Sequence, residues 1–121
     1  MITPLEIDHV YLHVSNLEKT RSHLESIFDF KFFQRPNSDK IAAVESKNIH
    51  FFIQEGNLPK EHLHKQHISF EIDDINAIKE KLENMEIPFR TGTFSYFTYK
   101  NYNWVEWRDH DGIKLECVQR L

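Results

Sequence analysis

Residues 9–27 read HVYLHVSNLEKTRSHLESI, and residues 67–85 read HISFEIDDINAIKEKLENM. When the sequence is shifted by 58 positions, so that His9 lies over His67, the two stretches align without a gap. Apolar residues then meet apolar residues at positions spread along both stretches, although few residues are identical. Such a match predicts two copies of one supersecondary unit.

Each copy begins with a strand pattern and continues with a helix pattern. Apolar residues alternate at Val10, Leu12 and Val14, and again in residues 68–72, which predicts two half-buried strands. Ser15 with Glu18 fits a helix capping box, and Asp73 or Asp74 can cap the second helix. The apolar residues that follow fall on one helical face in each copy: Leu17, Leu24, Ile27 and Phe28 in the first, and Ile75, Ile78, Leu82 and Met85 in the second.

Three short β-prone runs follow each helix. They cover residues 31–34, 40–45 and 48–54 in the first copy, and 88–93, 102–108 and 113–119 in the second. Asp111–Gly112 between the last two runs indicates a hairpin. The predicted fold is α+β: two βαβββ modules with mixed or antiparallel sheets in one domain, residues 1–121. Module one covers 5–55, a polar linker covers 56–66, and module two covers 67–121.

Composition excludes several classes of protein. The 15 Lys and Arg against 19 Asp and Glu give a net charge of −4, so no basic surface suggests a nucleic-acid partner. No run approaches the roughly 20 apolar residues of a membrane span, and the N-terminus lacks the zones of a secretory signal. The single Cys excludes an internal disulfide framework and suits a reducing cytoplasm, where we expect the protein.

Strand periodicity groups three potential metal ligands. If the apolar residues of each strand face the helices, His9, His67 and Glu116 all point to the opposite side of the sheets. Two imidazoles and one carboxylate on one side of a cation form a facial triad with open positions for water or substrate. Mn(II), Fe(II), Ni(II), Co(II) and Zn(II) all suit such a site.

Three segments resemble the signature segments of the vicinal oxygen chelate superfamily: IDHVYLHVSNLEKT at 7–20, QHISFEIDD at 66–74 and DHDGIKLE at 109–116. This superfamily includes glyoxalase I, fosfomycin-resistance proteins, extradiol dioxygenases such as those acting on dihydroxybiphenyl, and bleomycin-resistance proteins. The resemblance implies that the modules curl into a curved mixed sheet, a half-open barrel, and that two chains form a homodimer. It also places His9, His67 and Glu116 at the superfamily's metal positions.

The resemblance implies a function as well. We expect an enzyme that uses one divalent metal ion per site and acts on a small oxygenated substrate. Glyoxalase-like isomerisation, thiol transfer to an epoxide and ring-opening dioxygenation all remain open, with Glu116 as a candidate catalytic proton acceptor. The alternative is a metal-free protein that sequesters a small molecule, as bleomycin-resistance proteins do.

One position departs from the glyoxalase I pattern. Members similar to glyoxalase I carry a fourth ligand, a glutamate, on the last strand of the first module. When Ile49 is laid over Ile113, Phe52 falls at that position and Glu116 at its counterpart. The sequence therefore predicts three ligands.

Other polar residues are weaker candidates. Tyr11 and His13 share the face of His9 and are expected either to contact substrate or to fill the interior with hydrogen-bonded polar groups. Arg90 can hold a carboxylate or phosphonate, or can lie in a solvated loop. His62 and His64 fall in the linker, where a solvated loop is favoured over a second metal site.

Overall fold

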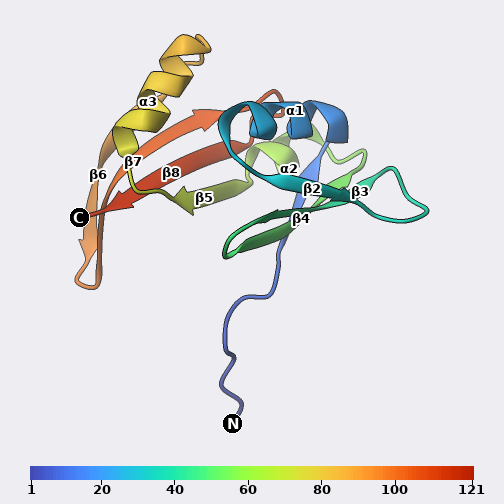
Figure 1. Ribbon diagram of the computed structural model, residues 1–121, viewed down its shortest axis with the longest axis horizontal. Coiled ribbons are helices and arrows are strands. Elements are labelled where there is room, and N and C mark those ends of the chain that lie inside the picture. Colours follow the sequence, from blue (N-terminus) through green and yellow to red (C-terminus); the bar gives the residue numbers. More distant parts are fainter. The chain divides into compact units, whose positions relative to one another are not determined.

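The computed structural model describes residues 1–121 and contains two compact units, residues 1–59 and 60–121 (Figure 1). Unit 1 contains β1 (Tyr11–Val14), α1 (Leu17–Ile27), β2 (Lys31–Gln34), β3 (Ile41–Ser46) and β4 (Ile49–Glu55). Unit 2 contains α2 (Lys60–His64), β5 (His67–Glu71), α3 (Ile75–Asn84), β6 (Arg90–Phe97), β7 (Lys100–Arg108) and β8 (Lys114–Arg120). No helix has the length and apolar character needed to cross a membrane.

Both units have the same topology. The strand order is β1-β4-β3-β2 in the first sheet and β5-β8-β7-β6 in the second. The first strand of each unit runs parallel to the last, and the remaining pairs are antiparallel. The predicted α+β fold with two βαβββ modules is therefore confirmed, and each module forms a four-stranded mixed sheet of its own.

Alternation along the strands separates an apolar face from a polar face. Leu12 and Val14 of β1 are almost fully buried, as are Val44 and Ile53 of the neighbouring strands. The expectation for Val10 was wrong: it precedes the first residue of β1, and its side chain is half exposed. We call the opposite side of each sheet, which carries Tyr11 and His13 in unit 1, the non-helix face.

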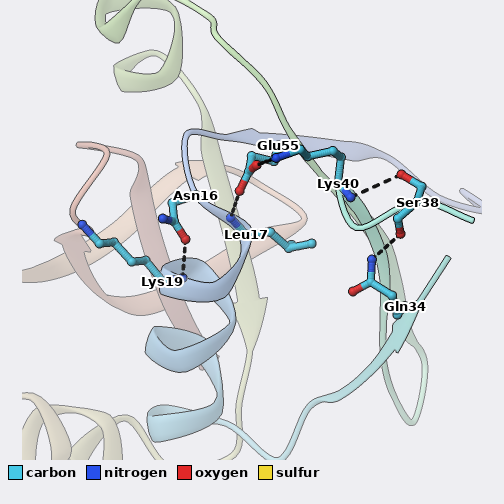
Figure 2. Close-up of polar contacts among 7 residues, drawn as sticks. All are labelled: Asn16, Leu17, Lys19, Gln34, Ser38, Lys40 and Glu55. Carbon is cyan, nitrogen blue, oxygen red and sulfur yellow. Dashed lines mark hydrogen bonds and ion pairs between the residues drawn. The ribbon is translucent and has the colours of Figure 1, made fainter.

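A side chain from the last strand supports the helix start in both units. Glu55 of β4 accepts a hydrogen bond from the backbone N–H of Leu17 at 2.8 Å (Figure 2). Gln119 of β8 does the same for the backbone N–H of Ile75 at 2.7 Å. Leu17 and Ile75 are 58 positions apart, so the repeat extends to a tertiary contact that satisfies an otherwise unpaired helix N–H.

The helix caps differ in part from those expected from the sequence. Asn16, and not Ser15, is the N-cap of α1, and its side chain accepts from the backbone N–H of Lys19 at 3.0 Å. Asp74 caps α3, as one of the two predicted alternatives. Ser15 and Asn16 are both good capping residues, so only the backbone conformation selects between them.

Part of the predicted linker is ordered against unit 2. Residues 60–64 form α2, whose Leu63 is buried. Arg108 donates to the carbonyl of His64 and to that of Gly112, both at 2.8 Å, and so ties α2 to the β7–β8 turn. Asp109 accepts from the backbone N–H groups of Asp111 and Ile113 within this turn, and burial raises its pKa. The predicted hairpin at Asp111–Gly112 is confirmed.

Candidate functional site

The non-helix face of unit 2 brings two of the predicted metal ligands together. His67 begins β5, and Glu116 lies on the adjacent parallel strand β8, opposite Ser69. The Nε2 atom of His67 lies 3.2 Å from the Oε1 atom of Glu116. The Glu116 side chain is only 10% exposed, while that of His67 is 45% exposed. An imidazole nitrogen and a carboxylate oxygen thus converge at the rim of the sheet, where a small ligand can reach the imidazole.

A second carboxylate lies directly beside this pair. Glu106 of β7 is opposite Glu116 in the β7–β8 register, and Arg90 of β6 is opposite Glu106. These residues and Ser69 form one line across all four strands, which we call the charged row. The carboxylate of Glu106 lies 3.5 Å from Arg90 and 3.4 Å from Lys114, and these two cations offset its negative charge.

A hollow of about 300 Å³ lies beside the charged row. It is lined by Pro88, Phe89, Arg90, Glu106, Trp107, Arg108 and Lys114. Three cationic side chains against one carboxylate give the hollow a positive balance, which suits an anionic group of a ligand. Arg90, which we expected either at a substrate or in a solvated loop, is a strand residue at this hollow.

Glu106 and Lys114 are not among the site residues predicted from the sequence. Lys114 sits two residues before Glu116 and therefore shares its face. Glu106 becomes opposite Glu116 only when the length of the β7–β8 turn is known. A two-residue turn at Asp111–Gly112 would put Glu106 opposite Cys117, so the hairpin signal alone misses the pairing by one residue. In the structure Arg108 pairs with Lys114, the loop covers residues 109–113, and Glu106 lies opposite Glu116.

In unit 1 the predicted ligand His9 lies just before β1. Its Nδ1 atom is 2.7 Å from the carboxylate of Asp8, and this hydrogen bond lowers the pKa of Asp8. The ring of His9 also packs on Phe52, with 4.5 Å between the ring centroids. Tyr11 and His13 follow on the same face, with their rings stacked at a centroid distance of 6.4 Å.

Strand register places Phe52 at the position of the missing fourth ligand. Phe52 lies opposite Tyr11 in unit 1, as Glu116 lies opposite Ser69 in unit 2. Because Tyr11 and Ser69 are equivalent in the repeat, Phe52 and Glu116 are equivalent as well. A phenyl ring cannot coordinate a cation of this class, so unit 1 offers only His9 at these positions.

The donor set can be compared with the needs of a divalent metal. His67 and Glu116 supply one nitrogen and one oxygen ligand in close proximity, which suits Mn(II), Fe(II), Ni(II), Co(II) or Zn(II). His9 belongs to the other unit, and no three His, Cys, Asp or Glu side chains are gathered in a geometry that holds a metal. The pair in unit 2 therefore fits two positions of a metal site.

The surroundings of His64 and Cys117 differ from those of a reactive site. The ring of His64 lies against Gly112 in the β7–β8 turn, on α2 and not in a solvated loop. Cys117 is fully buried on the helix-facing side of β8, and burial raises the pKa of its thiol to about 12. A neutral, inaccessible thiol is a packing residue and not a nucleophile.

Comparisons with known proteins agree with this topology. An integron cassette protein from the mobile metagenome of V. cholerae has a TM-score of 0.80 at 17% identity, over 98% of each chain. Lactoylglutathione lyase from Agrobacterium tumefaciens has a TM-score of 0.76 at 15% identity, over 96% of this chain and 94% of that one. The fosfomycin resistance protein FosX from Listeria monocytogenes, in complex with Mn(II) and sulfate, has a TM-score of 0.72 at 19% identity, over 97% of this chain and 91% of that one.

These identities are low, and the likeness shows a shared fold. No curated protein matches the sequence. The sequence model of one family, however, matches residues 6–117, which is nearly the whole chain. The chain belongs to the Glyoxalase/Bleomycin resistance protein/Dioxygenase superfamily, as the three signature segments predicted.

Proposed function

We propose that this protein is a divalent-metal-dependent enzyme that acts on a small oxygenated substrate. The observation that carries the proposal is the 3.2 Å approach of His67 Nε2 to Glu116 Oε1 on the non-helix face of unit 2. His9 occupies the place of His67 in the first repeat, and we propose it as the third ligand. The Mn(II) complex of FosX, a protein with the same fold, supports the choice of a divalent metal.

A divalent cation held by these residues supplies Lewis-acid stabilisation for negative charge that develops on a substrate oxygen. The protein residues have separate tasks. His67 and Glu116 present their ligand atoms from adjacent strands, which fixes the spacing between them. Glu116 is also the proposed proton acceptor, because it is the carboxylate nearest to the imidazole. Arg90 and Lys114 are positioned to hold an anionic group of the substrate at the neighbouring hollow.

The reaction belongs to one of three classes: glyoxalase-like isomerisation, thiol transfer to an epoxide, or ring-opening dioxygenation. All three use a substrate whose oxygen atoms approach a metal. Among the proteins with the same fold, a lactoylglutathione lyase supports the first class, and a fosfomycin resistance protein supports metal-dependent chemistry on an oxygenated substrate.

Metal content tests the proposal directly. Untagged protein is dialysed separately against Mn(II), Fe(II), Ni(II), Co(II) and Zn(II), then against buffer, and the retained metal is measured by plasma mass spectrometry. We expect about one tightly held ion per chain for at least one metal, because three protein ligands hold one ion at each site. The metal retained then directs the choice of lyase, transferase or dioxygenase assays.

A matched pair of histidine variants locates the site. His67→Ala removes a proposed ligand, and we expect it to abolish retention of the metal. His64→Ala is the control, because the hydrogen bond from Arg108 reaches the backbone carbonyl of His64 and is kept in the variant. Equal loss in both variants would place the metal elsewhere and refute the assignment.

The alternative function is metal-free sequestration of a small molecule, as in bleomycin-resistance proteins. The observation in its favour is Phe52, an aromatic residue at the position equivalent to the ligand Glu116. Protein that retains no ion from any bath but binds a small molecule supports this alternative. We also propose that the protein is a homodimer, which light scattering during size-exclusion chromatography tests by mass.

A further inference from the structure

The non-helix face of unit 1 carries a line of aromatic residues. Tyr11 of β1 is opposite Phe52 of β4, Phe52 is opposite Ala43 of β3, and Ala43 is opposite Phe33 of β2. We call these four residues the aromatic row. The rings of Tyr11 and Phe52 meet edge to face, with 5.1 Å between centroids. Ala43 leaves a gap between Phe52 and Phe33, because its side chain is a single methyl group.

A hollow of about 420 Å³ lies over this gap, and we call it the aromatic hollow. It is lined by Tyr11, Phe33, Gln34, Arg35, Pro36, Ile41, Ala43 and Phe52. Its volume and mainly apolar lining are typical of small-molecule sites. The residues Tyr11 and Phe33 are 44% and 52% exposed, so large aromatic surface faces solvent. Covering that surface with an apolar ligand is favourable.

The loop that closes one side of the aromatic hollow has a fixed shape. Gln34 donates from its side-chain amide to the carbonyl oxygens of Ser38 and Ile41. Figure 2 shows the contact of Gln34 with Ser38. It also shows Lys40, whose backbone N–H donates to the Ser38 hydroxyl and whose ammonium group pairs with Glu55. Asn37 adopts a positive φ of 63°, which turns the chain between these contacts. The loop that presents Arg35 is therefore held before any ligand arrives, which lowers the entropic cost of binding.

Charge identifies the polar part of the ligand. Arg35 is the one charged side chain that lines the aromatic hollow. No carboxylate lies within ion-pair distance of its guanidinium. A guanidinium without an acidic partner binds a carboxylate through two parallel hydrogen bonds. The aromatic hollow thus combines an apolar floor with one free cation at its side.

The equivalent row in unit 2 has the opposite character. Ser69, Glu116, Glu106 and Arg90 take the places of Tyr11, Phe52, Ala43 and Phe33 in the same strand order. The two copies of the repeat have therefore diverged along one line of the sheet. This divergence puts two carboxylates and a guanidinium on this line in unit 2 and apolar surface on it in unit 1.

We propose that the aromatic hollow of unit 1 is a binding site for a planar aromatic acid. The ring lies on Phe33, Ala43 and Phe52, and the carboxylate pairs with Arg35. The proposal concerns unit 1 alone and does not depend on a metal, so its test is separate from the test of metal retention. It gives a ligand class to the metal-free alternative, which also rests on Phe52.

Nuclear magnetic resonance titration tests the proposal. Uniformly ¹⁵N-labelled full-length protein is stripped of metal with a chelator and titrated with 2-naphthoate, and 2-naphthamide serves as the neutral control. We expect saturable shifts of backbone amides in residues 31–36, 41–44 and 51–53, and binding of the amide at least about tenfold weaker. An absence of saturable shifts, shifts confined to unit 2, or equal binding of the acid and the amide would each overturn the proposal.

Three variants separate the apolar from the ionic contribution. Ala43→Leu fills the gap between Phe52 and Phe33 and is expected to abolish binding. Arg35→Met is expected to raise the dissociation constant for 2-naphthoate about tenfold, to the value for the amide. Lys31→Met is the matched control, because Lys31 is an exposed cation on β2, the strand that leads into Arg35, but does not line the aromatic hollow.

Circular dichroism spectra and melting temperatures establish that each variant is folded. Arg35→Lys keeps the charge but loses the paired hydrogen bonds, so we expect its affinity to fall between wild type and Arg35→Met. Unchanged affinity in Ala43→Leu, or an equal loss in Lys31→Met and Arg35→Met, would refute the site.

Discussion

Replacing Glu55 by glutamine should make the stability of unit 1 less sensitive to acid. Glu55 accepts a hydrogen bond from the first helical N–H of α1, at Leu17, and forms an ion pair with Lys40. The contact with Lys40, together with the bond from Leu17, holds the pKa of Glu55 below its usual range. A carboxylate at this point also interacts favourably with the helix dipole. Gln119 performs the same capping in unit 2 without a charge.

The magnitude follows from these contacts. Glu55→Ala removes the acceptor at the start of α1, and loss of such a cap costs about 1–2 kcal/mol of unfolding free energy. Glu55→Gln keeps an acceptor and loses only the charge, so we expect a cost of about 0.5–1 kcal/mol at pH 7. The ion pair with Lys40 adds little, because the ammonium is well exposed and screened by solvent.

The pH dependence has a defined sign. A folded-state pKa below the unfolded value means that the contribution of Glu55 is fully present above the unfolded pKa, about 4.3. The contribution is lost as the pH falls through the lowered folded-state pKa. The difference in unfolding free energy between wild type and Glu55→Gln should therefore shrink below about pH 4. Glu55→Ala should remain less stable there, since it also lacks the acceptor.

Urea unfolding between pH 3 and pH 7 measures these differences. Far-ultraviolet circular dichroism follows both units, while fluorescence follows unit 2, because both tryptophans, Trp104 and Trp107, lie there. Gln119→Ala is the matched control: because glutamine carries no charge, its cost in unfolding free energy should be the same at every pH in this range. If the cost of Glu55→Gln were constant across this range, the assigned role of the Glu55 charge would be wrong.

Three further predictions concern unit 2. Gly112→Ala should cost about 1–2 kcal/mol of unfolding free energy in urea unfolding, because Gly112 has a φ of 73° and an added Cβ would lie 2.7 Å from Nδ1 of His64. Adding His64→Ala removes the clash but not the backbone strain, so it should recover only part of that loss. Native Cys117 should resist iodoacetamide at pH 8 and react at once in 6 M guanidinium, because burial raises its thiol pKa to about 12; rapid alkylation of native protein, read by mass spectrometry, would contradict its burial. Glu106→Gln removes the negative charge that offsets Arg90 and Lys114, so sulfate should bind the hollow beside the charged row several-fold more tightly in an amide-shift titration. Unchanged affinity would show that Glu106 does not control the charge of that hollow.

Local patterns predicted the elements that carry the site. Alternation along residues 67–71 and 114–120 put His67 and Glu116 on the non-helix face, because side chains of a strand point to opposite sides in turn. The same logic wrongly placed Val10 in the core, because periodicity does not show where a strand begins. Polar neighbours such as Ser15 and Asn16 are likewise equivalent in sequence, and only the folded chain selects one as the cap.

The sequence by itself determined the two-copy βαβββ plan, because the repeat and its apolar periods are properties of neighbouring residues. Only the tertiary structure decided which residues of different strands stand side by side. The charged row, with Glu106 next to Glu116, and the aromatic row, with Ala43 between Phe52 and Phe33, both depend on strand register. Register is set by the lengths of the turns and by hydrogen bonds between strands, and a shift of one residue would send every side chain to the other face.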